Sequence, residues 1–82
     1  MTDNFEVHVG NEVLITQRFL DERKRLFTQS EDLPVGVGEV GRIAAMKDGK
    51  GWVATDGIGV VGQVTVEVLV EMRQAYLDTE IT

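Results

Sequence analysis

Two stretches of the chain alternate apolar and polar residues with a period of two. The first lies at Phe5–Val9 and is followed, after a glycine and an asparagine, by an apolar stretch at Val13–Ile15. The second begins at Gln63, after which every other residue is a valine as far as Val70. Alternate side chains of a strand lie on one face, so both stretches predict β-strands. The later strand is expected to cover the first half of Gln63–Met72 and to pass into a short helix or an extended tail.

The middle of the chain predicts a hairpin. Arg42–Met46 has the composition of a strand, Lys47–Lys50 contains an Asp–Gly pair that favours a tight turn, and Trp52 begins the returning strand. A second Asp–Gly pair leads to a further short strand or extended loop at Ile58–Val61, which Gly62 is expected to end. Short strands separated by turns at such intervals are typical of all-β domains.

The segment Arg18–Asp32 allows two interpretations. Its large apolar residues have helical spacing, and good helix formers lie between them. One or two helical turns between Phe19 and Phe27 fit this pattern, and so does a long loop pinned by the two rings. At the other end of the chain, residues 79–82 are predicted to form a disordered tail.

Five short strands with one long early connection predict a single all-β domain over residues 1–82, folded as a five-stranded barrel. Four segments, VGNEVLI, LPVGVGEVGRI, GWVATDGIG and GQVTVEVLVEM, resemble in this order the strands of SH3-like barrels. In that fold a first strand is followed by a long loop, a glycine-containing entry to the second strand, a hairpin and a short last strand. The resemblance implies an SH3-like barrel between Val9 and Met72, followed by an additional helix or tail.

The glycines at positions 36, 38 and 41 have the spacing G-x-G-x-x-G, which also occurs in dinucleotide-binding loops. Such a loop needs a strand before it and a helix after it, so that the helix N-terminus faces the phosphates. Here Pro34 precedes the glycines, and residues typical of a strand follow them. The sequence therefore predicts glycines of a bent strand rather than a cofactor site.

Composition narrows the classes of function. The 82 residues include 14 acidic and 8 basic side chains, and the net charge of −6 repels phosphate backbones, so we expect no nucleic-acid partner. The chain has no cysteine and one histidine, His8, which argues against disulfides and against thiolate or multi-histidine metal sites. Its apolar runs are too short for a membrane span. We expect a cytoplasmic protein with no cofactor and no metal.

A non-enzymatic interaction module, binding another protein or a second copy of itself, fits these observations best. Aromatic side chains are enriched at the energetic centres of interfaces, so the candidate contact residues are Trp52, Phe19, Phe27 and Tyr76. Packing within the fold is the competing interpretation for these rings. The acidic composition would suit a basic partner, by analogy with small phage and mobile-element proteins that mimic nucleic-acid charge.

Two alternatives involve other classes of function. The plasmid-borne dihydrofolate reductases, which are tetramers of SH3-like barrels, are similar to this chain in length and layout. Their late strand carries V-Q-I-Y at a shared pore, whereas Gly62–Val66 reads GQVTV here and lacks the tyrosine. The first alternative is therefore a self-associating barrel with a different small-molecule or catalytic site at its subunit interface. The second is an accessory subunit of a larger enzyme.

Overall fold

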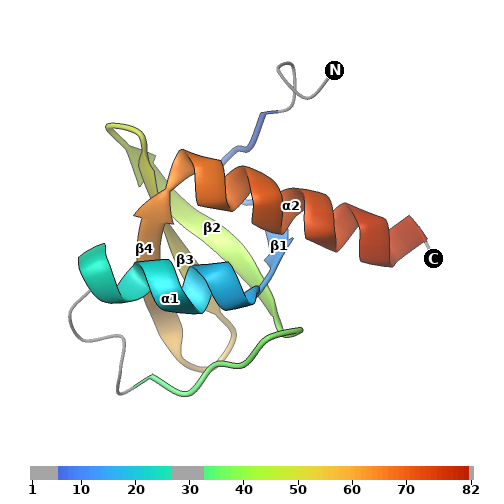
Figure 1. Ribbon diagram of the computed structural model, residues 1–82, viewed down its shortest axis with the longest axis horizontal. Coiled ribbons are helices and arrows are strands. Elements are labelled where there is room, and N and C mark those ends of the chain that lie inside the picture. The colour runs from blue at the N-terminus through green and yellow to red at the C-terminus, as the bar shows by residue number, and fades with distance from the viewer. Residues whose placement is uncertain (1–5, 27–32, 82) are drawn as a thin grey trace.

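Four antiparallel strands form one open sheet, and both helices lie on the same face of it (Figure 1). The structure is a computed structural model in which residues 6–26 and 33–81 are described. The sheet order is β1-β2-β3-β4, so β1 and β4 are its two edges. In chain order the elements are β1 (Glu12–Leu14), α1 (Gln17–Leu26), β2 (Val40–Lys47), β3 (Lys50–Thr55), β4 (Gly59–Thr65) and α2 (Val66–Ile81).

The predicted five-stranded SH3-like barrel is wrong. The described residues form four strands, and β1 and β4 do not pair to close the sheet. The two late strands expected at Ile58–Val61 and from Gln63 onward are a single strand, β4, because Gly62 does not interrupt it. Gly62 instead pairs with Val53 and turns its α-carbon toward α1, where an added Cβ would lie 2.7 Å from Phe19 Cζ. This glycine makes room for a helix rather than ending a strand.

The run of alternating valines continues from β4 into α2, so the pattern does not show where the helix begins. Val66 and Val70 are four residues apart, so they lie on one face of a helix as readily as on one face of a strand. The chain becomes helical at Val66, and Val68, Leu69 and Met72 are buried against the sheet. Because α2 continues to Ile81, the predicted disordered tail is wrong for residues 79–81, and residue 82 lies outside the described residues.

The ambiguous early segment forms a helix, α1, which begins with a side-chain cap. The hydroxyl of Thr16 accepts a hydrogen bond from the backbone N–H of Phe19 at 3.2 Å, satisfying one of the free donors of the first turn. The last turn carries Arg23, Lys24 and Arg25, whose positive charges are favourable at a helix C-terminus. The described part of the helix ends at Leu26.

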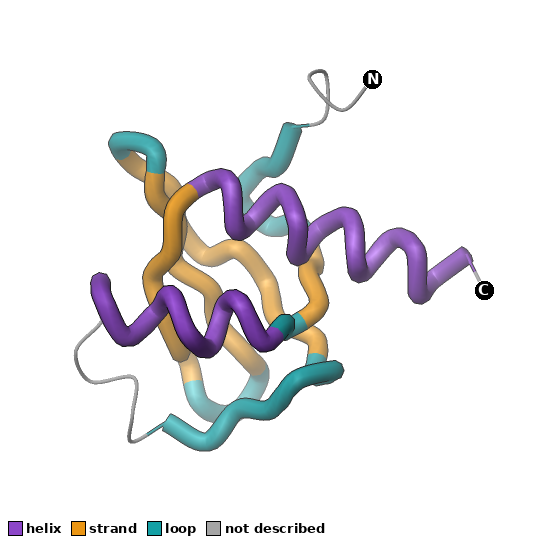
Figure 2. Tube along the Cα trace, viewed as in Figure 1, coloured by secondary structure: helices purple, strands orange, loops and turns teal. Residues whose placement is uncertain are grey.

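The hairpin prediction is confirmed. β2 and β3 are joined by Asp48 and Gly49, which have φ angles of 55° and 78°. Two successive positive φ angles match the twist of a two-residue hairpin turn. The glycine run at residues 36–41 leads through a loop directly into β2 rather than into a helix (Figure 2). The strand expected at Phe5–Val9 is absent from its described residues, 6–9, which are irregular.

The hydrophobic core lies between the sheet and the two helices. Gly51 faces α2 so closely that an added Cβ would overlap Leu69 Cδ1, and Gly62 has the same relation to α1. The two helices therefore pack against glycines in the sheet, which brings their large side chains into the core. The fully buried apolar side chains are Val13, Ile15, Phe19, Ile43, Val53, Val61, Val64, Val68, Leu69 and Met72.

Candidate interaction surface

The sheet has one covered face and one face on which the described residues place no helix. Burial alternates along β3: Gly51 and Val53 face the helices, so Trp52 and Ala54 lie on the other side. We call this other side the outer face. The register extends it to neighbouring strands, and its residues on β2, β3 and β4 are Arg42, Ala45, Lys47, Lys50, Trp52, Ala54, Val60, Gln63 and Thr65.

An apolar area occupies the middle of the outer face. Trp52 lies between Ala45 and Gln63 in the pairing register and is half-buried. A β-bulge between Ile43 and Ala45 adds a further exposed alanine beside them. An open hollow of about 460 Å³ lies over this area, and it is lined by Ala44, Ala45, Met46, Lys47, Trp52 and Val60.

Two further large apolar side chains lie on the outer face: Val60, which lines this hollow, and Val40, which lies beyond Arg42 along β2. Val40 is 49% exposed and Val60 is 37% exposed. Single exposed valines are ordinary, but a continuous apolar area around a tryptophan on an open sheet is a common feature of contact surfaces. This grouping, which the separate segments of sequence did not reveal, comes from the strand register.

The charges of the outer face differ between its two ends. Lys47 and Lys50 flank the hairpin at one end, whereas Asp56 lies at the other end, where it shares a hollow with Arg42 and Val40. Among the described residues, none of these four charged side chains forms an ion pair. The outer face therefore has an apolar middle, a basic end and an end that carries an acidic side chain.

At each edge of the sheet, an arginine from a helix binds one carbonyl oxygen. Arg73 of α2 donates a hydrogen bond to the carbonyl oxygen of Glu12 in β1 at 2.8 Å. Arg23 of α1 donates one to the carbonyl oxygen of Val61 in β4 at 2.9 Å. Unpaired strand edges can add strands from other molecules, and a side chain that covers the edge opposes this. Each arginine thus covers part of one edge, whereas the described helices cover none of the outer face.

Arg23 is the one buried charged residue among those described, with 7% of its surface exposed. Its guanidinium also donates to the carbonyl oxygen of Leu33 at 3.4 Å and lies 6.0 Å from the centre of the Phe19 ring. Burial lowers the pKa of Arg23 from its ordinary value. These contacts join α1, β4 and the segment before β2, so the residue has a structural role.

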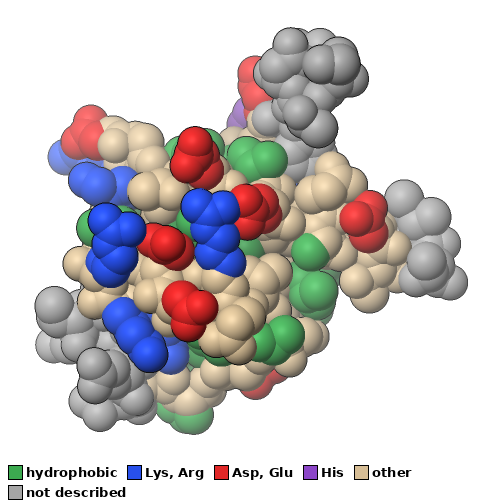
Figure 3. Space-filling view, viewed as in Figure 1, with side chains coloured by type: hydrophobic (Ala, Val, Ile, Leu, Met, Phe, Trp, Pro, Cys, Tyr) green, Lys and Arg blue, Asp and Glu red, His purple; other side chains and the backbone are tan. Residues whose placement is uncertain are grey.

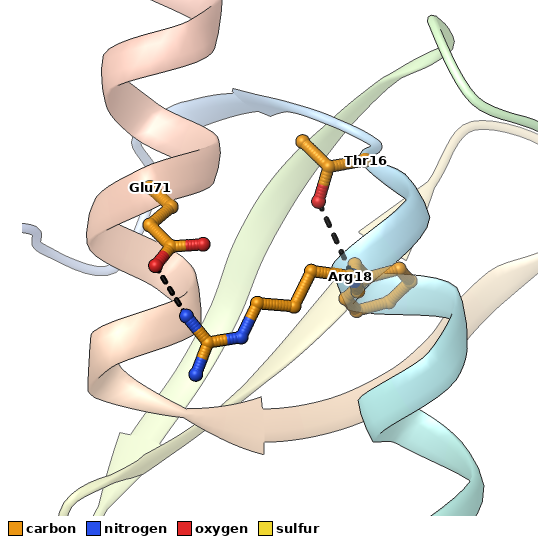
Figure 4. A network of polar contacts seen from close by, with 4 residues as sticks. Thr16, Arg18 and Glu71 are labelled. Atoms are coloured by element: carbon orange, nitrogen blue, oxygen red, sulfur yellow. Dashed lines mark hydrogen bonds and ion pairs between the residues drawn. The ribbon is translucent and has the colours of Figure 1, made fainter.

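The helical face is charged and offers a second hollow. Figure 3 shows acidic and basic side chains interspersed over this face of the molecule. Arg18 of α1 forms an ion pair with Glu71 of α2, and Figure 4 shows it reaching across between the helices. An open hollow of about 650 Å³ adjoins this pair, with Val66 and Val70 as its apolar lining. Exposed ion pairs contribute little stability, and the mixed charges here indicate a solvated surface.

The structure separates the four aromatic residues predicted as contacts. Trp52 lies on the outer face. Phe19 is fully buried, so its ring stabilises the core and we do not include it in the surface. Tyr76 is half-buried on α2, where its hydroxyl donates to Glu12 Oε1 at 2.7 Å and its ring is 5.6 Å from the Arg73 guanidinium carbon. Phe27 lies outside the described residues.

Comparisons with known proteins assign no family. No protein-family model matches the chain, and neither the search of curated proteins nor that of solved structures found a similar one. Within residues 6–26 and 33–81, no helix is long and apolar enough to cross a membrane. The same residues contain no cluster of three side chains able to hold a metal ion.

Proposed function

We propose that this protein is a non-enzymatic interaction module that binds another protein chain through the outer face. The observation that carries the proposal is the apolar area around Trp52, on a sheet face that the described helices leave uncovered. Tryptophan is enriched at the energetic centres of interfaces because it buries a large rigid surface and keeps one polar N–H. The small side chains of Ala45 opposite Trp52 and of Ala54 two residues along β3 leave room for a partner to contact the indole ring.

The surrounding residues suit a contact surface rather than a catalytic one. Lys47, Lys50 and Arg42 surround the apolar area and can pair with carboxylates at its rim, where such pairs favour orientation and rapid association. Interfaces of this kind combine an apolar centre with a polar rim. The half-buried Gln63 beside Trp52 supplies amide donors and an acceptor at the centre.

Two glutamines provide a matched test of which face meets a partner. Gln63 lies on the outer face and Gln74 is exposed on α2. Each is replaced in turn by a photo-crosslinking amino acid, and the tagged chain is irradiated in cells that normally contain it. The proposal predicts covalent adducts from position 63 and few from position 74. Adding Trp52→Asp should remove the adducts from position 63, because it places a charge in the apolar centre.

A second variant controls for charge and folding. Lys24 is an exposed residue of α1. Lys24→Gln changes the net charge by the same amount as Trp52→Asp and should leave the adducts unchanged. Circular dichroism should show that both variants are folded. Equal adducts from positions 63 and 74, or adducts that persist in the Trp52→Asp chain, would refute the proposed surface.

A further inference from the structure

We infer that the partner on the outer face is a second copy of this chain, stacked face to face about a twofold axis that crosses β3. This inference rests on the proposed function, because it names the partner of that same surface. Closed homodimers of this symmetry are the commonest oligomers, and each needs a patch that is complementary to itself. The residue order on the outer face meets this requirement.

The pairing register arranges the outer face in four rows across β2, β3 and β4. The hairpin end has a basic row, and the next two rows form the apolar middle. The fourth row is formed by Val40, at the start of β2, and Asp56, in the turn after β3, which line the same hollow. From the hairpin onward the rows are Lys47, Lys50 and Thr65; Ala45, Trp52 and Gln63; Arg42, Ala54 and Val60; and Val40 with Asp56.

A twofold axis that lies between the two copies, perpendicular to the strands, reverses this order. If the axis passes between the second and third rows, the first row of one copy faces the fourth row of the other. Lys50 then lies over the partner's Asp56, and Trp52 lies over the partner's Ala54. Lys50, Trp52 and Ala54 lie in β3 and Asp56 lies in the turn that follows it, so the axis crosses this one segment in both copies and generates each contact twice.

This arrangement places opposite charges and apolar groups together. Lys50 and Asp56, which form no ion pair among the described residues, acquire one across the interface. The aliphatic part of Lys47 lies over the partner's Val40 while its ammonium group stays in water. Trp52 comes close to the partner's Arg42, a pairing that is favourable between a guanidinium and an aromatic face. A tryptophan beside small alanines also provides the size alternation that face-to-face sheets need.

The net charge of −6 on each copy does not oppose this stacking strongly. Five of the described acidic side chains lie on the helices, on the opposite side of the sheet: Asp21, Glu22, Glu67, Glu71 and Asp78. At physiological salt, charges are screened over about 8 Å. The two layers of each molecule separate these carboxylates from their counterparts by more than that. Pairing through the edges is disfavoured because Arg23 and Arg73 occupy them.

The size of the patch sets the expected strength. With a strand spacing of about 4.8 Å and a rise of about 3.4 Å per residue, four rows on three strands cover roughly 20 by 15 Å. This is smaller than the patch behind a standard interface of about 800 Å² per partner. We therefore expect a weak dimer that forms and dissociates with concentration below about 1 mM.

Reversing the charge at Lys50 or at Asp56, at opposite ends of the outer face, tests the stacking. Lys50→Asp alone places two carboxylates together at both symmetric contacts, and Asp56→Lys alone places two ammonium groups together. Each variant should weaken the dimer at least about tenfold in sedimentation equilibrium. Mixed in equal amounts, the two variants should form a heterodimer, because both contacts then join opposite charges. Lys24→Asp, which makes the same change on α1, should leave dimerisation unaffected.

Each outcome decides between specific interpretations. Heterodimer formation by the mixture, with each variant alone monomeric, supports this stacking. A wild-type chain that stays monomeric to about 1 mM overturns it, as does a mixture that stays monomeric while the wild type dimerises. The crosslinking test separates this failure from that of the proposed function: adducts from position 63 at twice the 9.1 kDa chain mass indicate self-association. Adducts of another mass, lost with Trp52→Asp, would leave the interaction surface in place with a different partner.

Discussion

Gly62→Ala is predicted to destabilise the fold through the packing of α1 on β4. The added methyl carbon would lie 2.7 Å from Phe19 Cζ and 2.9 Å from Arg23 Cβ. Neither neighbour can move aside alone, because the Phe19 ring is fully buried and Arg23 Cβ is fixed to the helix backbone. The whole of α1 must therefore shift away from the sheet. Overpacking of this kind costs about 1–3 kcal/mol.

A smaller opposing effect comes from the unfolded state. Replacing glycine by alanine restricts the unfolded chain, which stabilises the fold by about 0.4–1 kcal/mol where the native backbone accepts alanine. The net expectation is a loss of about 1–2 kcal/mol, or a fall in Tm of about 4–16 °C for a domain of this size. Urea denaturation should show a lower midpoint with an unchanged slope.

Gly36→Ala is the matched control. A Cβ at this position meets only Glu39 Oε2, at 3.4 Å, and that atom ends a flexible side chain. Its stability should equal or slightly exceed that of the wild type. A Gly62→Ala chain as stable as the wild type, or equal losses in both variants, would refute the close packing of α1 against β4.

Two further predictions concern local structure. Thr16→Ala removes the cap of α1 and should lower the free energy of unfolding by about 1 kcal/mol, whereas Thr16→Ser should retain it; equal losses would contradict a capping role. Gly49→Ala should cost about 1–2 kcal/mol because its φ of 78° is unfavourable for alanine, while Asp48→Asn next to it should be nearly neutral. Both are measured by urea denaturation, and an unaffected Gly49→Ala chain would argue against the two-residue turn.

Local signals in the sequence predicted the local features well. The Asp–Gly pair at Asp48 and Gly49 forms the expected turn because only residues that tolerate positive φ fit there. The glycine run enters a strand as expected, since no helix follows it. These features depend on a few neighbouring residues, so they can be recognised without knowledge of the rest of the fold.

The closed barrel failed as a prediction because it depended on tertiary packing. A period-two run of valines also matches a helix at spacings of four, and the burial of Leu69 and Met72 against the sheet decides in favour of the helix. A glycine such as Gly62 is typical of a strand break, but here its missing side chain makes room for the Phe19 ring. Neither the packing of α2 on the sheet nor that of Phe19 on Gly62 can be recognised from the residues next to them in the sequence.

The candidate site was predictable only in part. Trp52 could be proposed from its residue type, but the same reasoning also selected Phe19, which is buried. The side chains that surround Trp52 on the outer face belong to three strands, and their positions depend on the β-bulge after Ile43. Strand register, rather than any motif, brings them together.

Self-association through the outer face around Trp52 can be followed residue by residue in solution. The most direct test follows the amide and indole N–H signals of the isotopically labelled chain by NMR as its concentration is raised to about 1 mM. If two copies meet through the outer face, the signals of Ala45, Trp52 and Val60 should shift with concentration, and those of Lys24 and Gln74 on the helices should change little. Shifts confined to the helices, or none at any concentration, would contradict it.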